Sequence, residues 1–409
     1  MTKISRYILV FIAIIVGAIT LPQLYWMAFD KPISIPLAHY SCIIDDFTIY
    51  NVKDKTYQDA EGHSYTRDEY EQLLPLRYIT QLTMDERMPD SIKGVESDMH
   101  VFARARSFTR IRPVDFHLPQ AKLYPLIESE SGRARLELPD DVFRVDWRVD
   151  FIDCNTNEVN EEKSRLFSAA LYHKGFAFPA KMIAGLPTTR KSRDDGYFII
   201  DAEDQLFHLK MIKGEPYIKK VEIPEGLQFK HIQCVDNKDR LYYAYLLGED
   251  GGIYILTQDD YKLIRWPIDD YLADEHTLLI SGDYFNYHVS IQSKDKLKCY
   301  ALNKNYEVVD TYEYTWTPNS EKTVGKIAST IFPFSLSLES PISRYIKFYP
   351  RMPKGFVWIL INLILVGAQI TIIRKREVKL KNNVLDLILI GLGGVFAFIA
   401  VNIFPNKWH

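Results

Sequence analysis

Three long apolar runs limit what this chain can fold into. They cover Tyr7–Ala28, Gly355–Ile373 and Val384–Phe404. Each run is close to the ~20 residues that a helix needs to cross ~30 Å of hydrocarbon. Each is also apolar on every side, whereas a helix of a soluble core keeps one polar face. The sequence therefore predicts three transmembrane helices, at residues 7–28, 355–373 and 384–404.

The first run also has features of a cleaved signal peptide, because Lys3 and Arg6 precede an apolar stretch. No small-x-small cleavage site follows, since Trp26, Met27 and Ala28 stand before Phe29. No cysteine is placed for lipidation. We therefore expect an uncleaved anchor at this end of the chain.

Basic residues near the spans set the expected orientation, because loops rich in lysine and arginine stay in the cytoplasm. Lys3 and Arg6 precede the first run, and five more cations fill residues 374–383: Arg374, Lys375, Arg376, Lys379 and Lys381. Aromatic residues mark the opposite ends of the runs: Tyr25, Trp26, Tyr349, Trp358 and Trp408. The chain is thus expected in the inner (cytoplasmic) membrane, with residues 1–6 and 374–383 in the cytoplasm. The domain at 29–323, the connector at 324–354 and the tail at 405–409 would face the periplasm.

Composition narrows the partners and the chemistry. A net charge of −3 over 409 residues disfavours nucleic acid, whose phosphates require a basic face. The four cysteines form no C-x-x-C pair, so zinc and thioredoxin-like chemistry have no support. Two alternatives remain for the four cysteines: they form disulfide bonds, or they are buried free thiols.

Residues 196–316 have the pattern of an all-β fold. Short β-type runs such as Tyr197–Ile200 and Leu206–Leu209 alternate with turn clusters roughly every 8–12 residues. Units of such runs begin about 35–45 residues apart with four short strands each, which is typical of β-propeller blades. We therefore predict a mainly β, propeller-like domain, with a β-sandwich as the alternative.

Two short helices are expected to pack on one side of this β domain. Thr66 and Glu69 form a capping box, and Pro75 should shorten the helix that follows. Asn160 can cap the second helix, which Gly175 should end. The apolar stripe of the second helix consists of Leu166, Phe167, Ala170 and Leu171.

Catalytic and metal-binding motifs are missing from the sequence. It contains no G-x-S-x-G, H-E-x-x-H, P-loop or dinucleotide fingerprint, so no catalytic residue, cofactor or metal is predicted. Asp236–Asp239 resembles a calcium loop, but Lys238 stands where a ligand is needed, which favours a solvated turn. In the third apolar run, Asp386 is expected to reach Lys379 or Lys381.

The densest polar cluster is the loop 187–196. Arginines with nearby hydroxyl groups can grip a phosphate or a carboxylate. We therefore single out Arg190, Lys191, Arg193, Asp194 and Asp195 as a ligand- or partner-binding site. The alternative is a solvated hairpin whose ion pairs contribute little. If its cations are exposed, replacing all three with glutamine should leave thermal stability nearly unchanged.

Several segments resemble a Bacteroidota membrane-protein family catalogued as domain of unknown function 4857. They are Ser131–Arg133, Leu138–Phe143, Glu162–Arg165, Pro187–Lys191, Gly196–Phe198 and Gln205–Lys210. The resemblance covers nearly the whole chain and brings no activity or catalytic residue with it. It implies a membrane-protein partner, an ABC-type transporter.

The function we expect is a non-catalytic, membrane-tethered binding or assembly module, an accessory component of a transporter or export complex. The alternative is an extracytoplasmic hydrolase that acts on glycans or lipids with carboxylates on its loops. The first is favoured because no nucleophile–base pair or metal set can be assembled from the sequence.

Overall fold

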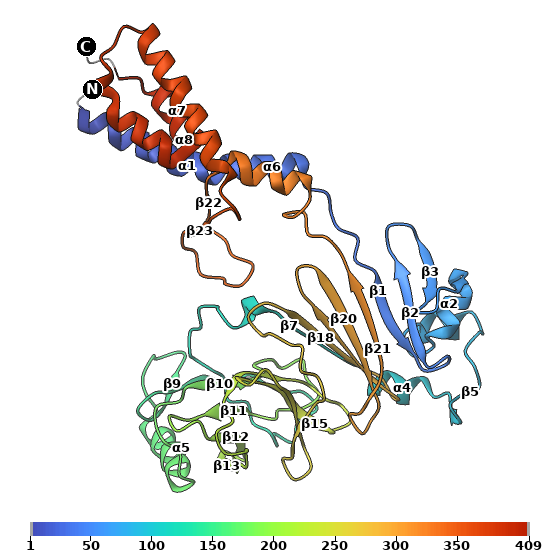
Figure 1. Cartoon of the computed structure of the whole chain (residues 1–409). Coiled ribbons are helices and arrows are strands. Elements are labelled where there is room, and N and C mark those ends of the chain that lie inside the picture. The colour runs from blue at the N-terminus through green and yellow to red at the C-terminus, as the bar shows by residue number, and fades with distance from the viewer. Residues whose placement is uncertain (1–2, 407–409) are drawn as a thin grey trace. The chain divides into compact units, whose positions relative to one another are not determined.

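The computed structural model describes residues 3–406 of the chain, which form two compact units (Figure 1). The helical unit consists of Met1–Ser34 and Thr315–His409, and the sheet unit consists of Ile35–Tyr314. Part of the predicted 405–409 tail, including Trp408, lies outside the described residues.

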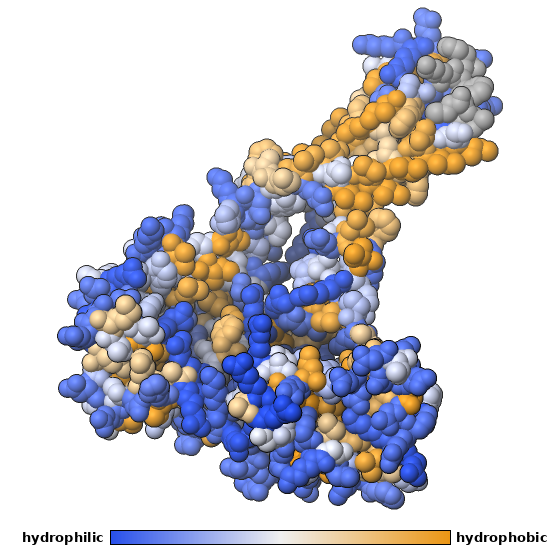
Figure 2. All heavy atoms as spheres, turned by 180° about the vertical axis from the view of Figure 1, so that it is seen from behind, coloured by the Kyte–Doolittle hydropathy of each residue, from blue (hydrophilic) through white to orange (hydrophobic). Residues whose placement is uncertain are grey.

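The three apolar runs form the long helices of the helical unit: α1 (Lys3–Phe29), α7 (Val357–Lys375) and α8 (Val384–Ile403). All three are long and apolar enough to cross a membrane. Figure 2 shows hydrophobic residues along these helices. Such an exposed apolar surface is stable in lipid and not in water, so the chain is a membrane protein.

The predicted connector 324–354 has structure of its own. It holds most of helix α6 and a small hairpin of two strands: α6 (Thr323–Ile331), β22 (Ser335–Ser337) and β23 (Tyr349–Arg351). The Tyr25 hydroxyl on α1 donates to the carbonyl oxygen of Val324 at 2.8 Å, so α6 packs against the end of α1.

Asp386 pairs with Arg6, so the expectation that it reaches Lys379 or Lys381 is wrong. The Arg6 guanidinium donates to both carboxylate oxygens, at 2.9 and 2.7 Å. The two side chains are only 4% and 1% exposed. A guanidinium binds a carboxylate through two parallel hydrogen bonds. In these apolar surroundings each charge is thereby compensated by the other.

The sheet unit contains four larger antiparallel sheets, which we number in chain order. The first sheet is β1 (Leu37–Ser41), β2 (Asp46–Asn51), β3 (Thr56–Asp59) and β4 (Ser64–Tyr65). The second is β10 (Met182–Gly185), β11 (Tyr197–Ile200), β12 (Leu206–Ile212) and β13 (Glu215–Val221). The third is β14 (Phe229–Cys234), β15 (Tyr242–Gly248), β16 (Ile253–Thr257) and β17 (Leu263–Arg265). The fourth is β7 (Ser107–Ile111), β18 (Thr277–Gly282), β19 (Tyr287–Gln292), β20 (Lys296–Leu302) and β21 (Val308–Thr315).

The mainly β prediction is confirmed, since strands in several small sheets are the predominant regular structure of this unit. Every strand predicted between 197 and 314 is present, although no closed propeller appears among the described residues. The pattern did not reveal β10, the first sheet, or the pairing of β7 with β18. It also missed a hairpin of β8 (Asp141–Val145) and β9 (Val149–Asp153).

Consecutive sheets share apolar cores. Trp266, Tyr245 and Ile280 belong to the core between the third and fourth sheets. A second core joins the second and third sheets, and a third joins the second sheet to the β8–β9 hairpin and α5 (Glu161–His173). The first sheet faces the fourth, because the Phe47 ring lies 5.6 Å from the His288 ring between ring centres. The burial of these faces drives the stacking of the sheets.

Both predicted helices are confirmed. Thr66 and Glu69 form the capping box of α2 (Arg67–Leu73), which ends before Pro75. Asn160 caps α5 by accepting from the Lys163 amide at 3.0 Å. Short elements that the sequence did not indicate follow α2: α3 (Ile79–Met84), β5 (Ser91–Ile92), β6 (Val95–Glu96), α4 (Met99–Ala105) and η1 (Pro113–Asp115).

The four cysteines are free thiols. Cys42, Cys234 and Cys299 are buried, whereas Cys154 is exposed. The disulfide alternative is therefore absent from the structure, and three of the four thiols fill apolar space as small side chains.

Candidate functional site

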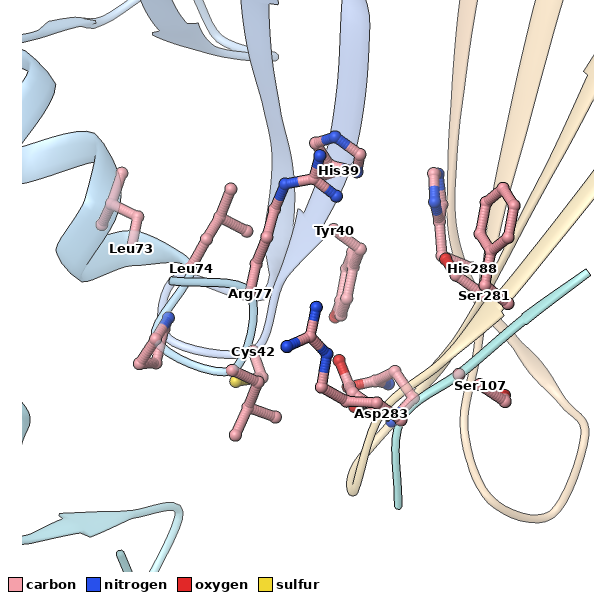
Figure 3. A pocket seen from close by; sticks show the side chains of 16 residues that line it. His39, Tyr40, Cys42, Leu73, Leu74, Arg77, Ser107, Ser281, Asp283 and His288 are labelled. Carbon is pink, nitrogen blue, oxygen red and sulfur yellow. Dashed lines mark hydrogen bonds between the residues drawn. The ribbon is translucent and has the colours of Figure 1, made fainter. Parts of the chain in front are cut away.

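A pocket of about 320 Å³, lined by both polar and apolar side chains, opens between the first and fourth sheets (Figure 3). This volume falls within the range of small-molecule sites. Its wall comes from β1, from the turn after α2, from the start of β7 and from the β18–β19 turn. The polar side chains that line it include His39, Arg77, Arg106, Asp283, Asn286 and His288.

Local structure brings these side chains together. Pro75 ends α2 and lets the chain turn, so Arg77 extends along the pocket beside His39 in Figure 3. Antiparallel pairing places His288 of β19 directly opposite Ser281 of β18. Arg106 stands at the junction where α4 ends and β7 begins. The pocket is therefore built from four separate stretches of the chain.

Two arginines give this pocket its charge. The guanidinium groups of Arg77 and Arg106 make no hydrogen bond or ion pair with any residue from 3 to 406. Asp283 does not neutralise them through a direct bond, because its carboxylate accepts from the amides of Phe285 and Asn286, each at 2.8 Å. Burial raises the pKa of Asp283 above its usual value, which these amides and nearby cations partly offset. The pocket therefore presents two cations that are available to an anion.

Neutral polar groups complete this site. The rings of His39 and His288 lie 5.7 Å apart between ring centres. Burial lowers the pKa of both imidazoles, and the Arg77 charge lowers it further; the pKa of His288 falls to about 4. Both rings are therefore uncharged at neutral pH. Nε2 of His39 and Oδ1 of Asn286 are buried without a hydrogen-bond partner in the described structure, so two polar atoms beside the pocket are unsatisfied.

Cys42 is the only pocket side chain with a potential sulfur nucleophile. Burial raises the pKa of its thiol to about 12, so the thiolate is absent at neutral pH. Thiolates are the reactive form of cysteine, and their activation requires a lowered pKa. The pocket is therefore arranged for binding an anion and not for covalent chemistry at this sulfur.

The loop singled out from the sequence is mostly neutralised from within. The Lys191 ammonium donates to Asp194, and the two side chains are only 4% and 2% exposed. Arg193 pairs with Asp195, at 3.1 Å from Nε to Oδ1, and also donates to Gln258. Among the five predicted site residues, Arg190 alone presents a charge that no described residue pairs. Ion pairs between the loop's own cations and carboxylates therefore hold its shape.

Little enclosed space lies beside this loop. The cavity beside it has a volume of about 10 Å³, which is close to the space that one water molecule occupies. Ser192 on the loop donates to Asp236 through its amide at 3.0 Å and its hydroxyl at 2.6 Å. Asp236 thus ties the turn at 236–239 to the loop. Residues 3–406 contain no group of three or more His, Cys, Asp or Glu side chains suited to a metal ion.

The pocket histidines predict a pH-dependent stability. A histidine with a lowered pKa contributes stability above its ordinary value of 6.5, which is lost as pH falls toward about 4. Between these pH values the histidines of the unfolded chain bind protons, whereas those of the folded pocket stay neutral. We expect the melting temperature of the full chain to fall between pH 6.5 and pH 4, and to fall less in His288→Asn. The exposed His173 provides the control, since His173→Asn should keep the full decrease. Equal melting temperatures of the wild type across this window would contradict this account.

Sequence reasoning did not find this pocket. His39 and His288 are single histidines far apart in the chain, and Arg77 is a single cation. Arg106 stands in an arginine-rich stretch, residues 104–112, that the sequence analysis did not single out. Only the stacking of the first sheet on the fourth brings them together. No local pattern marks such a site.

Comparison with protein families identifies the family of this chain. The sequence model of a family described as "Domain of unknown function (DUF4857)" matches residues 37–302, a span that includes every residue of the pocket and of the loop. No curated protein matches the chain.

Proposed function

This chain belongs to the family named domain of unknown function 4857, and we propose that it is a membrane-tethered binding protein whose pocket takes an anionic ligand. The ligand carries a carboxylate or a phosphate group. The observation that carries the proposal is the pair of unpartnered guanidinium groups, Arg77 and Arg106, in one pocket of about 320 Å³. Arginine recognises both oxyanions through charge-assisted hydrogen bonds.

The rest of the pocket supports recognition of a small molecule. His39 and Asn286 offer buried polar atoms that no described residue satisfies. Leaving such atoms unpaired is costly, and a ligand with polar groups beside its anionic group removes that cost. Leu74, Leu76 and Phe108 supply apolar wall around these groups, as in ligand sites generally.

Binding is a better account of this site than hydrolysis. A hydrolase on loop carboxylates requires an acid–base pair or an activated nucleophile. Asp283 is held by two backbone amides, and the Cys42 thiol stays protonated at neutral pH. Neither Asp283 nor the Cys42 thiol is therefore poised to attack a substrate.

The sequence favours a periplasmic position for this pocket. Basic residues next to α1 and after α7 favour a cytoplasmic position for those ends, which puts the sheet unit on the periplasmic side of the inner membrane. We propose that its sheets act as blades of a propeller-like array. The helical unit would associate with a transporter or export complex, for which an ABC-type transporter is the candidate partner.

A titration of the detergent-solubilised full chain tests the anion pocket. Isothermal calorimetry with inorganic phosphate and, separately, with succinate distinguishes phosphate from carboxylate recognition. We expect binding of at least one of these probes, weakened by added salt because the attraction is electrostatic. Each lost charge-assisted hydrogen bond contributes about 1.5–3 kcal/mol, so Arg77→Gln/Arg106→Gln should weaken binding at least tenfold.

The control for this titration is Arg110→Gln. Arg110 is exposed on β7, the strand that follows Arg106, and does not line the pocket. Its replacement should leave the affinity unchanged. Equal binding by the double variant and by the wild type would overturn the proposal, and so would a wild-type chain that binds neither probe.

A further inference from the structure

Helix α8 is broken at its middle. Gly394 has φ 53° and ψ −132°, a conformation outside the helical region that only glycine adopts readily. The residues on either side are helical, so α8 consists of two half-helices, 384–393 and 395–403. The half-helix 395–403 either continues across the membrane or turns back toward the side where the first half begins.

The contacts of the Arg6 side chain distinguish these two cases. Arg6 donates to the Asp386 carboxylate at 2.9 and 2.7 Å and, through Nε, to the carbonyl oxygen of Phe404 at 2.7 Å. In a straight helix with a rise of 1.5 Å per residue, Asp386 and Phe404 would lie about 27 Å apart. A single guanidinium cannot reach both ends of such a helix. The two halves must therefore run antiparallel.

Contacts elsewhere in the helical unit agree. The side-chain amide of Asn406 donates to the carbonyl oxygen of Asn382 at 2.9 Å, which joins the chain after α8 to the chain before it. Asn402 donates to Gln369 at 2.7 Å, near the end of α7 that leads into the basic loop. Figure 1 shows the start of α1 and the end of α8 at the same end of this unit.

The bend is supported by packing. A Cβ atom at Gly394 would lie 2.4 Å from Oδ1 of Asn362 and 2.9 Å from Pro333, so only glycine fits. The Asn362 amide donates at 2.9 Å to the carbonyl oxygen of Gly391, which the break removes from the helical pattern. The ring of Phe396 stacks on that of Phe332, 5.7 Å between ring centres. Irregular backbone at membrane depth is tolerated where protein covers and satisfies it in this way.

We infer that the third apolar run does not cross the membrane and is a re-entrant hairpin. It enters and leaves on the side that holds Lys3 and the basic loop 374–383. Each half-helix is about 15 Å long, half of a ~30 Å hydrocarbon core. Only α1 and α7 cross, and Asn406 lies on the same side as the N-terminal end of α1. This places the end of the chain opposite to the periplasmic position expected from three crossings.

Cysteine labelling in intact cells tests the inference. The probe is a cysteine appended after His409 through a short Gly-Ser linker, in a chain that carries Cys154→Ser. Two markers report the two sides: the native exposed Cys154 for the sheet unit, and Lys375→Cys in the Cys154→Ser chain for the basic loop. An impermeant maleimide is applied before or after permeabilisation of the cells. We expect the appended cysteine to be labelled under the same condition as Lys375→Cys. Labelling under the same condition as Cys154 would overturn the hairpin.

A pair of glycine variants tests the bend independently. Gly394→Ala should lower the melting temperature of the full chain, because alanine is strained at this φ and collides with Asn362. Gly391→Ala is the matched control in the same segment, since a Cβ there meets no atom within 4 Å. Equal melting temperatures of the two variants would contradict the observed bend, whatever the labelling shows.

Discussion

Replacing Asp386 with alanine is expected to lower the free energy of unfolding of the helical unit by about 3–5 kcal/mol. The variant leaves the Arg6 guanidinium buried among apolar side chains without its carboxylate partner. An uncompensated buried charge is among the most destabilising changes known in folded proteins. Thermal unfolding of the purified full chain in detergent measures the effect.

Two controls separate the ion pair from the loss of a side chain. Lys381 is exposed one turn before Asp386 and has no partner among the described residues, so Lys381→Ala should change stability by less than about 0.5 kcal/mol. Replacing both partners, as in Arg6→Met/Asp386→Leu, removes the charge together with its counter-charge and should cost less than Asp386→Ala alone. An Asp386→Ala chain that unfolds like the wild type would show that the pair does not hold α1 and α8 together.

The second large effect is expected at Lys191. Its replacement with glutamine leaves the Asp194 carboxylate buried without its cation, which should cost about 3 kcal/mol or more. The partly exposed Arg193 and the exposed Arg190 should contribute much less, because solvent screens their interactions. Treating all three cations as exposed, as the sequence alone suggests, predicts almost no change at any of them.

Single variants of these cations, compared by their melting temperatures, distinguish the two expectations. Arg190→Gln is the matched control, one residue away on the same loop. We expect Lys191→Gln to melt well below the wild type and Arg190→Gln to melt with it. If both variants melt with the wild type, the Lys191–Asp194 contact is not a structural element of the loop.

Local signals account for what the sequence predicted well. The strands between 197 and 314 follow from short apolar runs and the turns between them, which are properties of neighbouring residues. The caps at Thr66 and Asn160 depend on residues three positions apart. Nothing local indicates that β7 pairs with β18 from a distant part of the chain.

Apolar composition likewise could not distinguish a crossing helix from a hairpin. Gly393 and Ala397 have the four-residue spacing of small residues for close helix packing, and only the backbone angles of Gly394 reveal a bend. Prediction of the binding site from the sequence meets the same limit. Residues 190–195 attract attention because their charges are adjacent in sequence, yet burial pairs most of those charges with each other. The pocket cation Arg77 has no charged neighbour in the sequence, and Arg106 belongs to the arginine-rich stretch 104–112. Neither forms an ion pair within residues 3–406.

The most direct test of the central claim is to locate a bound oxyanion in crystals of the full chain. Selenate has the shape and charge of sulfate and scatters anomalously, so its position can be read without assumptions about contacts. The account predicts an anomalous peak within hydrogen-bond distance of both Arg77 and Arg106, and no such peak there in Arg77→Gln/Arg106→Gln. A pocket that stays empty while selenate occupies the loop at Arg190 would contradict the account and return the site to residues 190–195.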